Sequence, residues 1–385
     1  MKICLINNLY APWERGGAEK IVARAAKGLE QAGHDVFVIA TAPEETKSEN
    51  VYFLKSIFYN LSSYPLWQRL LWHIGDFFNP SHLRKIKEIL KNEKPDLVIT
   101  HNLKGVSLAL PRLLKKMSIR HFHTLHDIQL LHPSGLMYWK KESLINSFPA
   151  KAYQFFSRRL FASPEVVISP SHWLLSEHLT RGFFSQSKKI VLPNFFHDSR
   201  EVSRLPKNYD KFVFLFVGQL EKHKGVDFLL DCFLSLLEKN PDARAELRVV
   251  GEGSLLKELK IIATGHPEIK MIGHLPSEEI RDLMLEADCL VVPSLCYENS
   301  PTVIYEAAAA ELPVLASNLG GISELIEATG GWLFEPGSGS EFLVKMEHLV
   351  SFPQELEMAR KKEKQFSPAD YLSELENLAE RKNKG

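Results

Sequence analysis

The chain alternates, twice over, between short apolar runs and longer segments whose apolar residues recur at helical spacing. Such alternation is typical of α/β domains, in which helical crossovers join parallel strands. In the first half it predicts strands at residues 3–7, 36–40, 97–100, 119–124, 166–169 and 190–192, and helices at 18–31, 80–91 and 172–180. In the second half it predicts strands at 213–217, 246–250, 269–272, 289–292, 314–316 and 331–334, and helices at 226–238, 255–264, 277–286, 303–310 and 322–328. The pattern therefore predicts two doubly wound α/β domains.

A polar, irregular stretch at residues 193–209 separates the two alternations and is the predicted linker. We accordingly expect an N-terminal domain of residues 1–200 and a C-terminal domain of residues 201–367, with a final helix near 368–381. A chain of 385 residues is long enough for two cores. Doubly wound sheets bind ligands at the carboxyl ends of their strands, so a cleft is expected where two such edges face one another.

The composition is that of a soluble globular protein, with 45% hydrophobic and 24% charged residues. No stretch approaches the ~20 apolar residues of a membrane span. The chain starts directly with a strand pattern and shows no signal-peptide features. Four cysteines lie in or beside apolar runs without metal-binding spacing, which favours reduced thiols and a cytoplasmic location.

Charge is divided unevenly along the chain. Residues 1–195 contain 26 Lys and Arg against 15 Asp and Glu, whereas the remainder contains 21 against 32. A basic half suits an anionic partner such as membrane lipid, an acidic glycan or nucleic acid. The alternative is that the two halves attract one another across a cleft.

Two glutamates, Glu298 and Glu306, flank the start of a predicted helix that follows a strand. The backbone amides between them are unpaired first-turn donors, which favour an anion such as a diphosphate. Carboxylates on either side of that anion can accept hydrogen bonds from sugar hydroxyls. These features suggest a nucleotide-sugar site, although an ordinary strand–helix junction with a glutamate near the helix start has the same pattern.

Glycine-rich loops follow several predicted strands. Gly16 and Gly17 precede the first helix, without the dinucleotide-binding spacing, which weakens a dehydrogenase interpretation. Gly218 and Gln219 open a loop that ends in Lys224, where a solvated basic turn is the alternative, and Gly251 follows the next strand. Glycine lets a backbone approach a ligand closely.

Four histidines, His121, His123, His126 and His132, lie close together in sequence, and the first two fall on one face of a strand. No cysteine or suitably spaced acidic residue completes a recognisable set of ligands, so we predict no metal site. His126 follows the strand's carboxyl end, where ligands bind.

In this order and spacing the motifs resemble those of the retaining glycosyltransferases of family 4, which have the GT-B fold. The resemblance rests on the Glu298–Glu306 spacing followed by Pro313-Val314-Leu315-Ala316, on Gly16-Gly17-Ala18-Glu19, on the Gly218–Gly225 loop, and on Gly320-Gly321-Ile322-Ser323-Glu324. It implies two Rossmann-like domains, with the donor bound by the second domain and a C-terminal helix, 368–385, packed back on the first. It also implies a hexosyltransferase that moves a sugar from a nucleotide diphosphate to a hydroxyl.

The resemblance also assigns roles. Glu306 would bind the ribose hydroxyls, Glu298 the hydroxyls of the donor sugar, and Lys224 the diphosphate. His126 would face the transferred sugar, so His126, Glu298 and Lys224 are the expected catalytic residues. The remaining donor-binding residues would be Gly16, Gly17, Gly218, Gln219, Gly251, Ile272, His274, Ser300, Thr302 and Val303.

Gln219 departs from the family pattern, which has arginine there, and one bidentate phosphate ligand is thereby lost. This keeps open a non-catalytic nucleotide-sugar-binding subunit, and a GT-B sugar-nucleotide epimerase is a further alternative. The donor, of the GDP-mannose or UDP-sugar type, is treated as a substrate, and no cofactor or metal is expected.

The expected acceptor is a lipid-linked or cell-surface glycan. Aromatic and basic residues mix in the stretches 59–78 and 137–159, which suits either contact with an anionic membrane or packing within the domain. No nucleic-acid-binding motif is present. We expect a cytoplasmic protein, at the inner face of the membrane if these stretches meet lipid.

Overall fold

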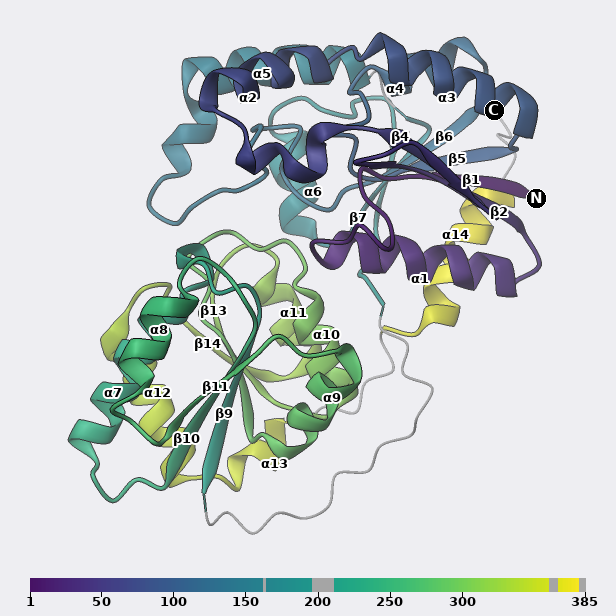
Figure 1. The fold of residues 1–385 in the computed structure, drawn as a ribbon. Coiled ribbons are helices and arrows are strands. Elements are labelled where there is room, and N and C mark those ends of the chain that lie inside the picture. The colour runs from purple at the N-terminus through teal and green to yellow at the C-terminus, as the bar shows by residue number, and fades with distance from the viewer. Residues whose placement is uncertain (162–163, 196–210, 360–365, 381–385) are drawn as a thin grey trace. The chain divides into compact units, whose positions relative to one another are not determined.

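The structure, a computed structural model, describes residues 1–161, 164–195, 211–359 and 366–380. The chain divides into two compact units. Unit 1 consists of Met1–Met137, Glu142–Phe195 and Pro368–Gly385, and unit 2 of Tyr138–Lys141 and Phe196–Ser367. Each unit has one parallel or largely parallel sheet with helices packed on it (Figure 1). The predicted α/β fold class is confirmed. The predicted linker, residues 193–209, lies mostly outside the described residues.

The described part of unit 1 contains an eight-stranded sheet in the order β3-β4-β2-β1-β5-β6-β7-β8. Its strands are β1 (Lys2–Ile6), β2 (Asp35–Ala42), β3 (Thr46–Ser48), β4 (Val51–Lys55), β5 (Leu97–Thr100), β6 (Arg120–Thr124), β7 (Val166–Ser169) and β8 (Lys188–Val191). All neighbours pair in parallel except β3 and β4. The six strands predicted here are present; β3 and β4, at one edge, were not predicted.

The helices of unit 1 include several that the sequence did not reveal. They are α1 (Gly17–Gln31), α2 (Leu66–Asp76), α3 (Pro80–Glu93), α4 (Leu110–Lys116), α5 (Phe148–Phe161), α6 (His172–Leu179) and α14 (Pro368–Glu380), with short 3₁₀ turns η1 (Ile57–Ser63) and η2 (Glu142–Asn146). Of these, α2, α4 and α5 were not predicted. Among the described helices, none combines the length and apolar composition needed to cross a bilayer.

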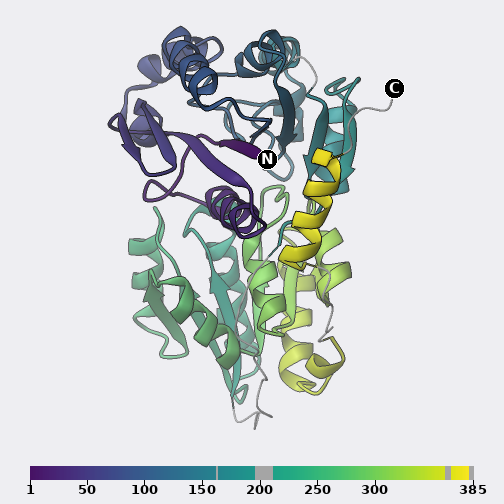
Figure 2. The ribbon, with the colours of Figure 1, turned by 90° about the vertical axis from the view of Figure 1, so that its right-hand side faces the viewer.

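The last helix, α14, belongs to unit 1 although unit 2 precedes it in the chain (Figures 1 and 2). Tyr371, Leu375 and Leu378 are buried in the same core as the strands of unit 1. The helix lies against α1, where Gly28 leaves room for Leu372: an added Cβ would come within 2.5 Å of a methyl carbon of that leucine.

Unit 2 contains, in its described part, six parallel strands in the order β11-β10-β9-β12-β13-β14. They are β9 (Phe212–Val217), β10 (Ala245–Val250), β11 (Ile269–Gly273), β12 (Cys289–Val292), β13 (Val314–Ser317) and β14 (Gly331–Phe334). The helices are α7 (Val226–Lys239), α8 (Leu256–Ala263), α9 (Ser277–Glu286), α10 (Thr302–Ala309), α11 (Ile322–Thr329), α12 (Gly339–Ser351) and α13 (Glu355–Ala359), with one 3₁₀ turn, η3 (Lys222–Lys224). Every strand predicted in the second half is present, while α12 and α13 were not predicted.

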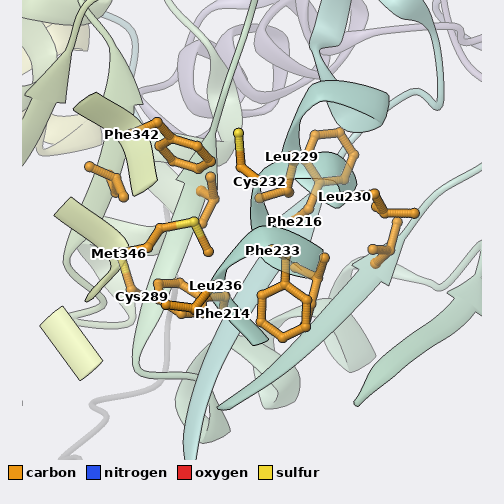
Figure 3. Close-up of a cluster of buried hydrophobic side chains, with 14 of the residues drawn as sticks. Phe214, Phe216, Leu229, Leu230, Cys232, Phe233, Leu236, Cys289, Phe342 and Met346 are labelled. Atoms are coloured by element: carbon orange, nitrogen blue, oxygen red, sulfur yellow. The ribbon is translucent and has the colours of Figure 1, made fainter. Parts of the chain in front are cut away.

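Both faces of the unit 2 sheet are buried, as expected of parallel strands. Phe214 and Phe216 on β9 point to one face and pack with side chains of α7 and α12, such as Phe233 and Phe342 (Figure 3). The intervening Leu215 belongs to the cluster on the other face, with residues of α9, α10 and α11. This packing holds the carboxyl ends of the strands, and the loops that follow them, in fixed positions.

Candidate functional site

The strand order of each sheet reverses at one point, and the loops that follow the strands there diverge. In unit 2 the reversal lies between β9 and β12, which pair with one another although β10 and β11 come between them in sequence. In unit 1 it lies between β1 and β5. Such reversals leave a crevice at the carboxyl ends of the strands, where open α/β sheets bind ligands.

Lys224 and Glu298 meet at the reversal in unit 2. Lys224 Nζ lies 2.5 Å from Glu298 Oε1, and the Ser294 hydroxyl donates to the same oxygen over 3.0 Å. Burial raises the pKa of Glu298, but the charge of Lys224 and the hydrogen bonds from Lys224 and Ser294 outweigh it and leave that pKa lowered. Burial lowers the pKa of Lys224, and Glu298 more than reverses this effect. Both groups are therefore charged at neutral pH.

Glycines bring the backbones of this site into contact. Gly225 has φ +70°, and a Cβ there would lie 2.0 Å from the Pro293 carbonyl oxygen. Nearby, the Leu295 amide donates to the His223 carbonyl over 2.9 Å. These contacts join the loop after β9 to the loop after β12. The carboxylate and the lysine are thus held by backbone as well as by their own ion pair.

A second pair of glycines fixes Glu298 from the other side. The Gly321 amide donates to the Glu298 carbonyl over 2.8 Å, and a Cβ on Gly320, which has φ +68°, would lie 2.4 Å from that same carbonyl oxygen. The Gly320-Gly321 motif therefore supports the loop that carries Glu298.

Helix α10 starts directly after this loop. Its N-cap is Pro301, whose side chain cannot accept a hydrogen bond from the first-turn amides. Those amides, which include Thr302 and Val303, are the kind of donors that hold anions at helix starts. Glu306 is half-buried in the second turn, and the Ser300 hydroxyl pairs with the Tyr305 hydroxyl over 2.7 Å. The structure therefore places the predicted anion donors between the two glutamates.

The other predicted residues of unit 2 lie at the same edge of the sheet. A Cβ on Gly251, which has φ +141°, would come within 1.8 Å of the Gly218 carbonyl oxygen. Gln219 is exposed next to Gly218. On β11, Ile272 is half-buried, and the exposed His274 follows that strand directly.

The predicted glycines of unit 1 start helix α1. Gly16 is the N-cap, and its amide donates to Glu19 Oε2 over 3.0 Å. Glu19 is buried, and burial raises its pKa. This loop follows β1, at the strand reversal of unit 1.

His126 follows β6 in unit 1, and its Nε2 lies 2.9 Å from Nδ1 of His101, which follows β5. Burial lowers the pKa of His126 to about 4, so its ring is neutral at physiological pH. The neighbouring Asp127 accepts hydrogen bonds from the backbone and side-chain amides of Gln129. The sequence alone does not reveal the contact between His101 and His126, because it requires β5 and β6 to be neighbours.

The histidines of β6 have local partners. His121 Nε2 and His123 Nδ1 both contact the Thr100 hydroxyl, at 2.7 and 2.9 Å. Within the described residues, no group of three or more His, Cys, Asp or Glu is placed to hold a metal ion. Of the predicted site residues, Gly16, Gly17 and His126 belong to unit 1 and the others to unit 2.

Two family models together match nearly the whole chain. Residues 15–200 match the model described as Glycosyltransferase Family 4, and residues 198–366 match the model described as Glycosyl transferases group 1. The chain belongs to the family 4 glycosyltransferases. It is therefore a member of a family of enzymes that transfer sugars, and its fold is GT-B.

Individual relatives and solved structures match nearly the whole chain. The chain is 28% identical to an uncharacterized 42.6 kDa protein in the cps region of Klebsiella pneumoniae, over 97% of this chain and 98% of that protein. It is 26% identical to the putative teichuronic acid biosynthesis glycosyltransferase TuaC of Bacillus subtilis, over 90% of each. Among solved structures, Anabaena HepE in complex with UDP and glucose matches with a TM-score of 0.70 and 18% identity, over 99% of this chain and 100% of HepE.

Proposed function

We propose that this glycosyltransferase moves a sugar, with retention of configuration, from a nucleotide diphosphate donor bound by unit 2 to a hydroxyl of a lipid-linked or cell-surface glycan. The observation that carries the proposal is the ion pair of Lys224 and Glu298 beside the first turn of α10. A cation, helix-start amides and a carboxylate at one strand edge suit a diphosphate next to a sugar.

We assign the roles that the family resemblance implies, and the positions of the residues support them. The α10 amides and Lys224 bind the diphosphate, and Glu306, one turn farther along α10, accepts hydrogen bonds from the ribose hydroxyls. Glu298 accepts hydrogen bonds from the donor sugar. When the diphosphate enters, Lys224 divides its contacts between phosphate and Glu298, so the leaving group meets a cation that is already in place.

The reaction exchanges one bond for another. The bond between the sugar's anomeric carbon and the diphosphate oxygen breaks, and its electron pair leaves with the diphosphate. The acceptor oxygen forms the new bond on the same face, and its proton passes to the departing phosphate oxygen. No carboxylate nucleophile is assigned in unit 1, so this front-face route is the mechanism we propose, with neutral His126 hydrogen-bonded to the transferred sugar.

The donor and acceptor classes rest on the relatives. HepE was solved with UDP and glucose, which makes a UDP-sugar the first donor to test, ahead of GDP-mannose. The relative in the cps region and TuaC, named for teichuronic acid biosynthesis, favour a surface polysaccharide as the acceptor.

The first test is thermal stabilisation by UDP, GDP, ADP, dTDP and NAD. A ligand present at about 100 times its dissociation constant adds roughly 2.7 kcal/mol to the stability of the unit that binds it. Stabilisation by one nucleoside diphosphate, reduced to roughly half in Glu306→Ala, is the expected result. Stabilisation by NAD alone, or by none of the five, contradicts the proposed donor site.

Gln219 favours a second candidate, a non-catalytic subunit that binds a nucleotide sugar. The exposed amide stands where family members carry arginine, and it supplies no positive charge to a diphosphate. A binding subunit would show nucleotide-dependent stabilisation but neither sugar transfer nor slow donor hydrolysis. An epimerase would instead convert the donor without an acceptor, which NMR of the sugar products detects.

We further propose that unit 1 contacts an anionic membrane through α2 and α5. The two helices lie side by side (Figure 1). The ring centroid of Phe77, the C-cap residue of α2, is 6.4 Å from that of Phe156 on α5. Their outer faces expose apolar side chains that we call the α2–α5 surface: Trp67, Leu71, Ile74, Phe148 and Phe156. Phe148 is 86% exposed and Ile74 67%. A group of large apolar side chains this exposed to solvent is unusual unless a partner covers it.

Charge favours lipid as the partner of this surface. Helices α2, α3, α4 and α5 together carry 11 Lys and Arg against three Asp and Glu. One of those three acids, Asp76, is buried and accepts hydrogen bonds from the Gly105 amide. Apolar and aromatic side chains among lysines and arginines are the features of a helix that lies in an anionic interface.

Vesicle co-sedimentation tests this surface without any substrate. Binding to vesicles of phosphatidylcholine mixed with phosphatidylglycerol, but not to phosphatidylcholine alone, is expected. The double change Leu71→Ser and Ile74→Ser should weaken that binding about tenfold. Ile261→Ser, at a 75% exposed apolar position of unit 2, is the matched control and should change nothing. Equal binding by both variants, or no binding by the wild type, would rule out this surface.

A further inference from the structure

We propose that His101 fixes the tautomer of His126, so that His126 carries its ring proton on Nδ1 and acts on the ligand as a hydrogen-bond donor. His101 is then a positioning residue that acts through His126. The role of His126 in transfer rests on the proposed function; the tautomer does not.

The backbone holds both rings in place. The His101 amide donates to the Ile6 carbonyl over 2.8 Å, so the loop after β5 is tied to β1. The Leu125 amide donates to the Ile168 carbonyl over 2.8 Å, which ties the residue before His126 to β7. Strands β5 and β6 are parallel neighbours, and their carboxyl ends bring the two rings together. The ring centroids lie 5.2 Å apart.

Both rings are neutral, so each carries one proton. Burial lowers the pKa of His101 well below its usual range, and the nearby His126 lowers it further. Burial lowers the pKa of His126 to about 4. A neutral imidazole has one donor nitrogen and one acceptor nitrogen. The 2.9 Å contact therefore needs a proton either on His101 Nδ1 or on His126 Nε2.

The other nitrogen of His101 decides between the two arrangements. His101 Nε2 is buried and has no hydrogen-bond partner. If His126 Nε2 donated, His101 would carry its proton on Nε2, and a buried N–H would be left without an acceptor, which native proteins rarely tolerate. If His101 Nδ1 donates, Nε2 carries no proton, and no buried N–H is left without an acceptor. The second arrangement costs less, and it puts the proton of His126 on Nδ1.

The consequence is chemical. With Nε2 accepting from His101, His126 presents an N–H at Nδ1 rather than a lone pair. It can donate to a sugar hydroxyl oxygen, but it does not accept a proton from the acceptor hydroxyl at that nitrogen. A donor fixed in this way need not reorganise when the substrate binds.

NMR of the full chain labelled with ¹⁵N-histidine tests the assignment, because protonated and bare ring nitrogens resonate in separate regions. The His126 signals are identified by their loss in His126→Gln. The wild type should show a protonated Nδ1 and a bare Nε2 at His126. His101→Asn places an amide N–H near the position of the imidazole Nδ1 and should preserve this pattern, whereas His101→Leu removes the donor and should lose it.

Kinetics provide the functional readout. We expect His101→Leu to lower kcat about tenfold, the value of one hydrogen bond in the transition state, with the KM for the donor unchanged because unit 2 binds it. His101→Asn should restore most of that rate. A wild-type His126 protonated on Nε2, or a His101→Leu variant with unchanged tautomer and rate, would overturn the proposal. If the wild type shows no transfer, the proposed function fails, while the NMR result still decides the tautomer.

Discussion

Lys224 Nζ and Glu298 Oε1 lie 2.5 Å apart, so the cation that follows β9 is paired with the carboxylate that follows β12. Both side chains are largely buried, with 27% and 15% of their side-chain areas exposed. One ion pair thereby joins the two loops on either side of the strand reversal in unit 2.

Replacing Lys224 should therefore affect stability as well as catalysis. Lys224→Met leaves Glu298 buried without a cation, and we expect unit 2 to lose about 3 kcal/mol of unfolding free energy. Urea unfolding measures the loss. The double variant Lys224→Met with Glu298→Gln removes the uncompensated charge and should be more stable than Lys224→Met alone. If the double variant is the less stable, the pair is not the source of the effect. In the transfer assay, Lys224→Ala should lower turnover more than donor affinity.

Glu306 should act mainly on donor affinity. Glu306→Ala removes a charged hydrogen-bond acceptor from the proposed ribose contact, which should raise the dissociation constant of the nucleoside diphosphate about tenfold or more. Isothermal titration calorimetry with the nucleotide identified by thermal stabilisation gives the value. Glu278→Gln, on the exposed first turn of α9, is a control of the same residue type. Unchanged affinity in Glu306→Ala would remove the ribose contact from the proposal.

Gln219→Arg tests the departure from the family pattern. A guanidinium at this exposed position adds a bidentate phosphate ligand, so affinity for the nucleoside diphosphate should rise about tenfold. The gain should shrink as salt is added. Gln219→Lys supplies the charge without the bidentate geometry and should gain less. If arginine gives no gain, residue 219 does not meet the diphosphate.

Alanine substitutions at two glycines distinguish the cost of backbone strain from the cost of a steric clash. Gly251→Ala combines a left-handed backbone with a Cβ that would lie 1.8 Å from the Gly218 carbonyl oxygen, and it should cost unit 2 about 3 kcal/mol or more. Gly273 also has positive φ, at +89°, but an added Cβ meets nothing within 4 Å, so Gly273→Ala should cost about 1 kcal/mol. Thermal unfolding compares them. Equal losses would mean that the close approach after β9 and β10 does not matter.

The buried histidines make unit 1 sensitive to acid. Burial lowers the pKa of His178 to about 4. The unfolded state takes up the proton near pH 6.5, so stability is present above that pH and is lost as the pH falls toward about 4. Between about pH 7 and pH 5 this one residue accounts for a loss of roughly 2 kcal/mol.

His178→Leu should flatten this pH dependence by that amount. The ring's Nε2 is buried without a partner, but Nδ1 lies 2.9 Å from the Leu174 carbonyl oxygen, so removing the ring should cost about 1 kcal/mol at neutral pH. Asp76, whose pKa burial raises to about 7, acts in the opposite direction, but it is present in both proteins and cancels in the comparison. Denaturant unfolding at several pH values provides the measurement; parallel curves for the two proteins would contradict the assignment.

Much of the fold could be predicted because buried parallel strands have continuous apolar sequences bounded by turns. Strands β5, β7, β12 and β14 have the bounds that the sequence predicts. Helices α2 and α5 were not predicted, because the mixed aromatic and basic residues of stretches 59–78 and 137–159 suit a membrane interface as well as a helix packed on its own domain.

The sequence alone proposes the members of the candidate site, but it does not give the contacts between them. Glycines and glutamates that follow strands identify the loops of the candidate site. Glycine permits a close approach of the backbone, and glutamate can accept hydrogen bonds from sugar hydroxyls. The ion pair of Lys224 and Glu298 joins residues 74 positions apart, and it depends on β9 and β12 being neighbours. The contact of His101 with His126 depends in the same way on β5 and β6. No local sequence pattern contains these adjacencies.

Helix α14 has a consequence for how the protein is made. Its residues are the last of the described chain to leave the ribosome, yet Tyr371, Leu375 and Leu378 complete the core of unit 1, whose strands are made first. Throughout the synthesis of unit 2, the nascent unit 1 therefore presents an uncovered apolar surface beside α1. A newly made unit 1 should depend on chaperones during that interval, and its final stability should arise only after α14 has been made.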